Sequence, residues 1–159
     1  AVALTLATHA IADPVEVDLS AHVDASPEQV LAVLTNFESW GDVFVSVETL
    51  HAERQDSFHA RVRQKARRAG HTLAYTLVAT IDPNGSRVEL ALDPAQPHDL
   101  EELRTTWRIQ ALPNGGSRID LHVLTDSGLP VPGFIERAVA EGTARTSLDE
   151  LVVALNPGI

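Results

Sequence analysis

The order of its segments constrains this chain more than any single motif. An alternating apolar and polar stretch, Val15–Val23, is followed at once by a short helical segment, then by a run of strand-like segments, and last by one long amphipathic stretch, Val131–Leu155. Period-two alternation predicts strands with one wet face, and apolar residues at three- and four-residue steps predict a helix. The order therefore predicts an α+β domain in which a curved sheet wraps around a long C-terminal helix.

The first helix has a clear start signal. Ser26 suits the N-cap, Pro27 suits the first helical position, and Gln29 completes a capping box with Ser26. Apolar residues at helical spacing follow as far as Phe37. We expect a short helix here and a second short turn over 36–42, which gives two short helices after the first strand.

Six further strands are expected after Val43, where the apolar period falls to two. Asn84-Gly85 and Asn114-Gly115 mark hairpin turns, because Asn-Gly readily takes a positive φ. Short turns make consecutive strands antiparallel, so the sequence predicts a seven-stranded antiparallel sheet. The expected strands are Val45–Arg54, Ser57–Arg67, His71–Ile81, Arg87–Asp93, Leu100–Leu112 and Ser117–Asp126.

The overall composition excludes several classes of function. A length of 159 residues with 44% hydrophobic residues is typical of one globular domain. The net charge of −10 argues against nucleic-acid binding. The absence of cysteine excludes disulfides, thiol catalysis and cysteine metal sites, and it fits a reducing or an oxidising compartment equally. No apolar stretch is long and continuous enough for a transmembrane helix.

The N-terminal segment, residues 1–12, has two interpretations. Ala10-Ile11-Ala12 resembles the end of a secretory signal, although no basic region precedes it. The alternation over Val2–Thr8 is equally typical of an extra strand or an irregular arm. We therefore expect an arm or a signal-peptide remnant over 1–12 and a single ligand-binding domain over 13–159, in a cytoplasmic rather than an exported protein.

The segment that includes the first helix carries a family resemblance. It begins Val23-Asp24-Ala25-Ser26-Pro27-Glu28-Gln29-Val30 and has Asn36 where an aspartate is usual. Together with Trp107-Arg108-Ile109 and Leu129-Pro130, it resembles the START-related helix-grip superfamily, in the polyketide cyclase/dehydrase and lipid-transport branch. The resemblance implies the helix-grip fold. Members include lipid carriers, aromatase/cyclases, hormone receptors and quinone-binding proteins, so fold analogy alone does not choose a function.

Alternation also assigns an inner face to the sheet. That face is mostly apolar, with Tyr75, Thr105 and Trp107 as polar groups, which suits a hydrophobic ligand with one or two hydrogen-bonding groups. The alternative is that these side chains fill the space under the helix. The expected ligand-binding residues are Leu73, Tyr75, Leu77, Leu90, Leu92, Leu103, Thr105, Trp107, Ile109 and Leu121 from the strands, with Phe134 and Ala138 from the helix.

Candidates for catalysis are few. Tyr75 could act as a general acid or orient a carbonyl, and His71 begins the same strand on the same face. The alternative for Tyr75 is a core tyrosine with its hydroxyl at the cavity rim. The seven histidines include no close pair at metal-ligand spacing, so we expect no metal and no cofactor.

One strand carries an unusual charge pattern. Arg61, Arg63, Lys65 and Arg67 alternate along a single face, and Arg54–Arg68 holds six of the 12 basic residues. Such a pattern is typical of a solvated outer face that resists strand pairing. It also fits a docking surface for an anionic partner, such as a phospholipid membrane or an acyl carrier protein.

Three functions follow, in order of preference. The first is binding or transport of a hydrophobic small molecule, such as a lipid, quinone, sterol or polyketide, between the sheet and the C-terminal helix. The second is a polyketide cyclase or aromatase reaction in the same cavity. The third is docking of an acidic partner through the basic strand 61–67. The sequence indicates neither the ligand nor the oligomeric state.

Overall fold

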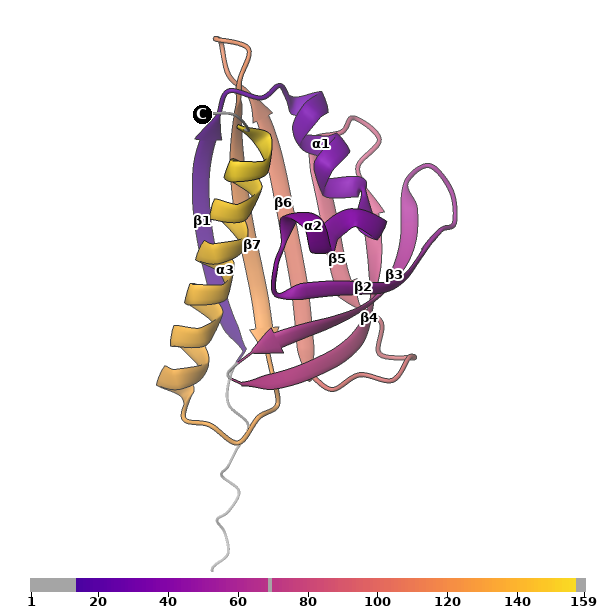
Figure 1. Ribbon diagram of the computed structural model, residues 1–159, viewed down its shortest axis with the longest axis vertical. Helices are drawn as coiled ribbons and strands as arrows, with labels where there is room; N and C mark the ends of the chain where they lie inside the picture. The colour runs from indigo at the N-terminus through magenta and orange to yellow at the C-terminus, as the bar shows by residue number, and fades with distance from the viewer. Residues whose placement is uncertain (1–13, 69, 157–159) are drawn as a thin grey trace, which may run out of the picture.

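A seven-stranded antiparallel sheet curves around one long helix (Figure 1). The computed structural model describes residues 14–68 and 70–156, so the segment 1–12 lies outside the described residues. The strand order is β1-β7-β6-β5-β4-β3-β2. The strands are β1 (Val15–Val23), β2 (Val47–Arg54), β3 (His59–Arg68), β4 (His71–Ile81), β5 (Arg87–Leu92), β6 (Glu102–Ala111) and β7 (Ser117–Asp126). The helices are α1 (Pro27–Thr35), the 3-10 turn η2 (Phe37–Ser39), α2 (Trp40–Val43) and α3 (Gly133–Leu155).

The predicted α+β helix-grip fold is confirmed, and the differences are confined to strand ends. The second strand begins at Val47 rather than Val45, whose residue surface is 82% exposed. The sixth begins at Glu102 rather than Leu100, which is buried in the loop before it. Alternation predicts a strand from its interior, and it carries little information about the residue where pairing stops.

The predicted capping box fixes the start of α1. The backbone N–H of Gln29 donates to Ser26 Oγ at 3.3 Å, and the Ser26 N–H donates to Gln29 Oε1 at 2.8 Å. These bonds satisfy polar groups that a helix start otherwise leaves to water. Val30 and Leu34 are fully buried, so the capped helix is held on the sheet by its apolar side.

The junction between β1 and β7 places α1 over one end of the sheet. Val23 pairs with Ser117 at the last step of the β1–β7 ladder. The buried Ser117 hydroxyl then donates to the Ala25 carbonyl at 2.8 Å. A Cβ on Gly116 would lie 2.4 Å from the Val23 carbonyl oxygen, so the backbones approach here as closely as only glycine allows.

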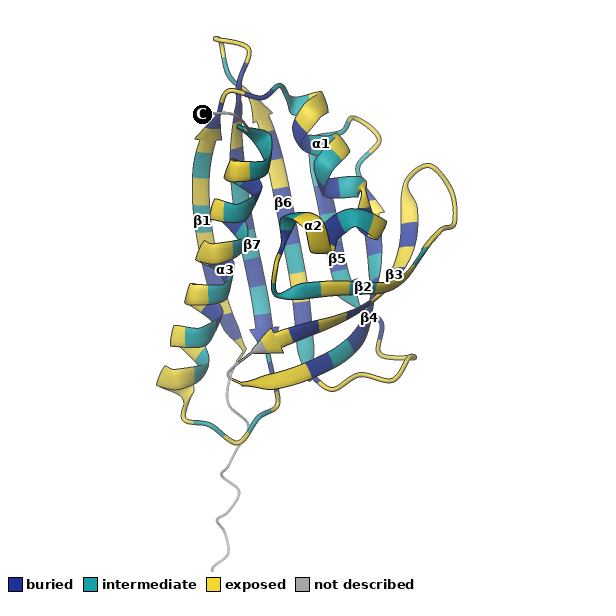
Figure 2. Cartoon of the chain, viewed as in Figure 1, coloured by how far each residue is buried: buried dark blue, intermediate teal, exposed yellow. Residues whose placement is uncertain are grey.

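The long helix α3 lies along β1 and β7 (Figure 1). Figure 2 shows exposed residues along the outer side of α3 and buried residues on the strands behind it. Near its start, Glu136 accepts from the Ser127 N–H at 2.6 Å and from the Ser127 hydroxyl at 2.8 Å, which ties the preceding loop to the first turn. None of the helices in the described part of the chain is both long and apolar enough to cross a membrane.

The sheet ends at β2, which is an irregular edge strand. Its pairing with β3 shifts register between Thr49 and His51, which marks a β-bulge or a similar irregularity. Bulges increase local twist and are common at sheet edges. Glu48 and Glu53 are exposed on this strand, and each lies opposite a basic residue of β3.

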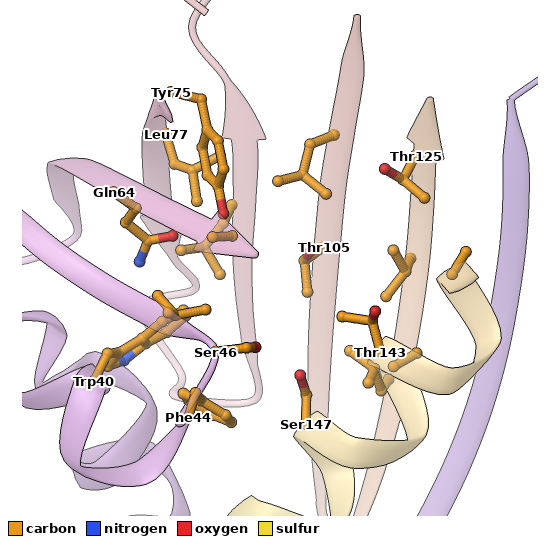
Figure 3. A pocket seen from close by; sticks show the side chains of 18 of the residues that line it. Trp40, Phe44, Ser46, Gln64, Tyr75, Leu77, Thr105, Thr125, Thr143 and Ser147 are labelled. Carbon is orange, nitrogen blue, oxygen red and sulfur yellow. The ribbon is translucent and has the colours of Figure 1, made fainter. Parts of the chain in front are cut away.

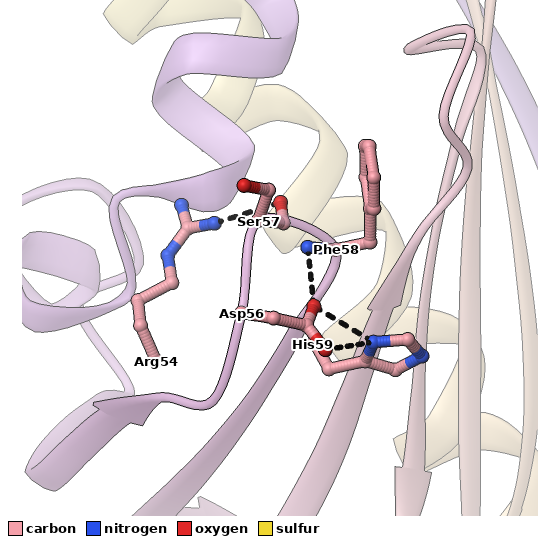
Figure 4. Close-up of polar contacts among 5 residues, drawn as sticks. All are labelled: Arg54, Asp56, Ser57, Phe58 and His59. Atoms are coloured by element: carbon pink, nitrogen blue, oxygen red, sulfur yellow. Dashed lines mark hydrogen bonds and ion pairs between the residues drawn. The ribbon is translucent and has the colours of Figure 1, made fainter.

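A polar cluster fixes the turn between β2 and β3 (Figure 4). Asp56 accepts from the Phe58 N–H at 2.7 Å and from His59 Nδ1 at 2.9 Å. The Arg54 guanidinium donates to the Ser57 carbonyl at 3.4 Å and to the carbonyl of Thr35, at the end of α1, at 3.2 Å. The hairpin is thereby connected to the first helix.

Two glycine substitutions are expected to have opposite effects on stability. Gly116→Ala forces a backbone displacement at the β1–β7 junction and should lower the free energy of unfolding by about 2–3 kcal/mol. Gly142→Ala, in α3 with open space around its Cβ, should raise it by about 1 kcal/mol through helix propensity. Urea unfolding followed by circular dichroism measures both. Equal effects of the two substitutions would contradict the described junction.

The pKa of Asp56 is expected to respond to its neighbours. The Phe58 N–H and the His59 ring stabilise the carboxylate and lower the pKa of Asp56 from its ordinary value of 3.8. A lowered folded-state pKa stabilises the protein above the unfolded pKa, and this contribution is lost as the pH falls through the folded pKa. NMR titration should place the Asp56 midpoint below 3.8. His59→Ala should raise that midpoint, and an unchanged midpoint would contradict the described contact.

Candidate ligand-binding cavity

A cavity lies between the inner face of the sheet, the segment around α2 and the middle of α3 (Figure 3). Figure 3 shows Gln64 and Tyr75 on one side of the space, and Thr143 and Ser147 of α3 on the other. Its lining mixes apolar side chains with a few hydroxyl, amide and ring N–H groups. The lining residues are Trp40, Phe44, Ser46, Val47, Gln64, Ala66, Arg67, Tyr75, Leu77, Leu90, Leu103, Thr105, Trp107, Leu121, Val123, Thr125, Ala140, Thr143, Ala144 and Ser147.

The cavity is narrow. Its empty space is about 740 Å³ when the part open to solvent is included. The volume in which the centre of a water molecule can move is only about 80 Å³. The smaller volume is the one to compare with the roughly 300–1,000 Å³ of small-molecule sites, so a ligand of several rings requires the walls to move apart.

Most of the residues predicted from alternation lie in the cavity wall. Because β4 to β7 present every second side chain to the inner face, the strand pattern alone identifies them. Tyr75 is 3% exposed and is directed into the space. The predicted residues that line the cavity are Tyr75, Leu77, Leu90, Leu103, Thr105, Trp107 and Leu121.

Three predicted strand residues lie outside the lining. Leu73 and Ile109 are buried in the core, and Leu92 is partly buried at the end of β5. Each stands near one end of its strand. Alternation predicts which face of the sheet a side chain is on, but it does not predict how far the cavity extends along each strand. The cavity does not reach the strand ends where these three residues lie.

The two predicted helix residues lie outside the cavity lining. Phe134 is 76% exposed and Ala138 is exposed, whereas Ala140 and Ala144 line the cavity. Two residues along a helix rotate a side chain by about 200°, so the prediction assigned nearly the opposite side. The cause is that the inner face of α3 carries small residues beside the cavity, while the large apolar Phe134 lies in solvent.

Gln64 is a lining residue that the sequence prediction missed. It alternates with the exposed Arg63 and Lys65, and it is 1% exposed on the inner face of β3. Period two along this strand was sufficient to place it opposite the basic residues. The polar character of glutamine concealed it, because buried positions are normally sought among apolar residues.

Two buried donors in the cavity have no partner. Gln64 Nε2 and Trp107 Nε1 lie on residues that are 1% and 2% exposed, and neither atom forms a hydrogen bond within the protein. Trp40 gives the contrast, because its indole Nε1–H donates to the Leu34 carbonyl at 3.1 Å. Buried donors are nearly always satisfied in folded proteins, so this pair is unusual.

A chain of aromatic rings forms the end of the cavity near α2. Ring centroids lie 5.6 Å apart for Phe37 and Trp40, 5.0 Å for Trp40 and Phe44, and 6.1 Å for Phe44 and Trp107. Such tilted and edge-on pairs are favourable arrangements that hold rings in fixed orientations. Three of these rings line the cavity, which offers flat apolar surfaces to a ligand.

The two catalytic candidates are not brought together in one lining. Tyr75 faces the cavity, but His71 is exposed at the start of β4 and lies outside the lining. Arg67 is the one cationic residue among the described lining residues, and its exposed side chain belongs to the outer row of β3. Within the described residues, no group of three histidine, aspartate or glutamate side chains is arranged to hold a metal ion.

The basic side chains of β3 alternate with the buried Val62, Gln64 and Ala66, so they point to the outer face of the sheet. Arg61, Arg63, Lys65 and Arg67 are all exposed. Acidic residues partly balance them: Arg61 Nε is 3.6 Å from an oxygen of Asp93, and Glu48 and Glu53 pair with Lys65 and Arg61 in the β2–β3 ladder. Docking of an anionic partner here stays a prediction.

Comparison with solved structures supports the fold. The Zhui aromatase/cyclase from a Streptomyces species is 17% identical, with 90% of this chain and 94% of that chain covered and a TM-score of 0.75. A START superfamily protein from Mycobacterium smegmatis is 16% identical, with 89% and 97% covered and a TM-score of 0.73. A STAR-related lipid transfer protein from Xanthomonas axonopodis is 12% identical, with 89% and 86% covered and a TM-score of 0.75.

Sequence comparison identifies the family. No curated protein matches the chain significantly. The sequence profile described as polyketide cyclase/dehydrase and lipid transport matches residues 14–156, which is nearly the whole described chain. The confirmed helix-grip fold agrees with this match. The chain therefore belongs to the polyketide cyclase/dehydrase and lipid-transport family.

Proposed function

We propose that the protein reversibly binds a hydrophobic small molecule in the cavity between the sheet and α3, as a carrier or binding protein. Membership of the family supports a hydrophobic-ligand or cyclase role. The observation that carries the proposal is the cavity wall itself, in which leucines and aromatic rings surround a space that Ala140 and Ala144 of α3 leave unfilled. Protein cores are normally closely packed, so an unfilled apolar space favours a ligand site.

A second candidate function is a cyclase-type reaction in the same cavity. The Zhui aromatase/cyclase shares the fold, and the Tyr75 side chain is directed into the space with Arg67 also in the lining. A phenol hydroxyl can donate to a ketone oxygen and orient it for attack by a carbon nucleophile. His71 contributes nothing to this candidate, because it lies outside the lining.

Filling the cavity from α3 is expected to weaken the binding of an apolar probe. Ala144→Leu adds three carbons at a buried position in the lining, whereas Ala138→Leu adds the same atoms on the exposed side of the helix. Fluorescence titration with N-phenyl-1-naphthylamine should show at least a roughly tenfold weaker affinity for Ala144→Leu, about 1.4 kcal/mol of binding free energy. Ala138→Leu should bind like the wild type. Equal binding by all three proteins would place the probe elsewhere.

Tyr75→Phe separates the two candidate functions. It removes one hydroxyl and keeps the ring that packs in the wall. If the protein is a cyclase, the variant should lose at least tenfold in the rate of cyclising an acyclic poly-β-ketone thioester while it still binds N-phenyl-1-naphthylamine. A wild-type protein that binds the probe and converts no such thioester supports the binding function instead. Chromatography of the thioester reaction gives the readout.

A further inference from the structure

The unpartnered donors Gln64 Nε2 and Trp107 Nε1 indicate which chemical groups the ligand has. Both residues line the cavity. A buried donor without an acceptor loses its hydrogen bonds to water and gains none in return, which destabilises the folded protein. An indole can only donate, so no rotation of the Trp107 ring turns its nitrogen into an acceptor.

We infer that the ligand is a compact, neutral ring compound with carbonyl or equivalent oxygens, which accept hydrogen bonds from Trp107 and Gln64. The inference rests on the proposed binding function and specifies its ligand class. A hydrocarbon tail would fill the cavity and leave both donors unpartnered. A ligand oxygen at each donor would supply the missing acceptor in a partly enclosed, mostly apolar site, where a hydrogen bond is stronger than in water.

The charges around the cavity favour a neutral ligand. The two donors are an amide and an indole, which carry no net charge. Arg67, the one cationic residue among the described lining residues, is exposed at the surface end of the lining. Burial of a carboxylate against neutral donors is costly, whereas a ketone or quinone oxygen is well matched to them.

The positions of the two donors indicate separated acceptors on the ligand. Gln64 lies on β3 opposite Tyr75, and Trp107 lies on β6 opposite Val88 and Leu121. Strands β4 and β5 stand between them in the sheet. The Trp107 ring also continues the aromatic chain through Phe44, with centroids 6.1 Å apart. A ring compound with acceptors at two separate points suits this arrangement.

A matched pair of probes tests the inference. Naphthalene and 1,4-naphthoquinone have the same two-ring skeleton and differ by two carbonyl oxygens. The chain has no cysteine, so the quinone has no thiol to add to. We expect the protein to bind naphthoquinone about tenfold or more tightly than naphthalene in equilibrium dialysis, as one or two gained hydrogen bonds imply.

The two tryptophans provide a direct readout of the hydrogen bond. Trp40 and Trp107 are the only tryptophans, so a ¹⁵N-labelled protein shows two indole N–H signals, which Trp107→Phe assigns. Naphthoquinone should move the Trp107 indole proton downfield as it forms a hydrogen bond. The Trp40 indole is already bonded to the Leu34 carbonyl and serves as the internal reference. Naphthalene should cause no downfield shift of the Trp107 proton.

Substitution of the donors completes the test. Trp107→Phe and Gln64→Leu should each reduce the preference for naphthoquinone by about fivefold to tenfold. The preference is the ratio of the two affinities measured on the same variant, so a loss of wall contacts that weakens both probes equally does not change it, and circular dichroism shows that each variant folds. Ala138→Leu, on the exposed side of α3, is the control and should keep the full preference.

The possible failures are distinguishable. If the wild type binds naphthalene and naphthoquinone equally, with no shift of the Trp107 indole, the proposed binding function stands and the inference about carbonyl oxygens is overturned. A preference for naphthoquinone that survives in both donor variants also overturns it. If neither compound binds the wild type, the proposed function fails for ring compounds of this size, and the inference fails with it.

Discussion

The packing of α3 against β1 and β7 decides where the cavity lies. A long helix laid along one side of a curved sheet covers the strands beneath it and leaves the rest of the inner face to be closed by other segments. Here α2 and the loop to β2 close it, with Trp40 and Phe44 as the contacting rings. Because Ala140 and Ala144 have small side chains, α3 does not fill the remaining space. The helix therefore both supports the domain and sets the width of the site.

Local signals were sufficient to predict most of the fold. The capping residues of α1, the alternation in the strands and the Asn-Gly turns each act over a few residues, and all agree with one antiparallel sheet. The inner side of α3 could not be predicted in the same way. Hydrophobic periodicity is dominated by large side chains such as Phe134, whereas the side that faces the cavity carries alanine, threonine and serine. Only the sheet opposite shows which side of the helix is enclosed.

The candidate site was predicted in part for a related reason. Alternation identified wall residues such as Leu90 and Trp107 but gave no limit to the cavity along each strand. The informative polar groups differ from those first considered. His71 is exposed, while Gln64 is buried beside Tyr75 on the face turned away from the arginines. Among relatives with one fold and many ligands, a few such buried donors are better guides to specificity than the apolar wall that all of them require.

The irregular edge at β2 has a consequence for the protein in concentrated solution. An open antiparallel sheet presents unpaired backbone groups at each edge, and a flat apolar edge can recruit a strand from another molecule. The register shift between Thr49 and His51 and the exposed charges of Glu48 and Glu53 make β2 a poor template for such growth. The protein can thus keep a deeply curved, open-edged sheet around its ligand site while resisting fibrous self-association through this edge.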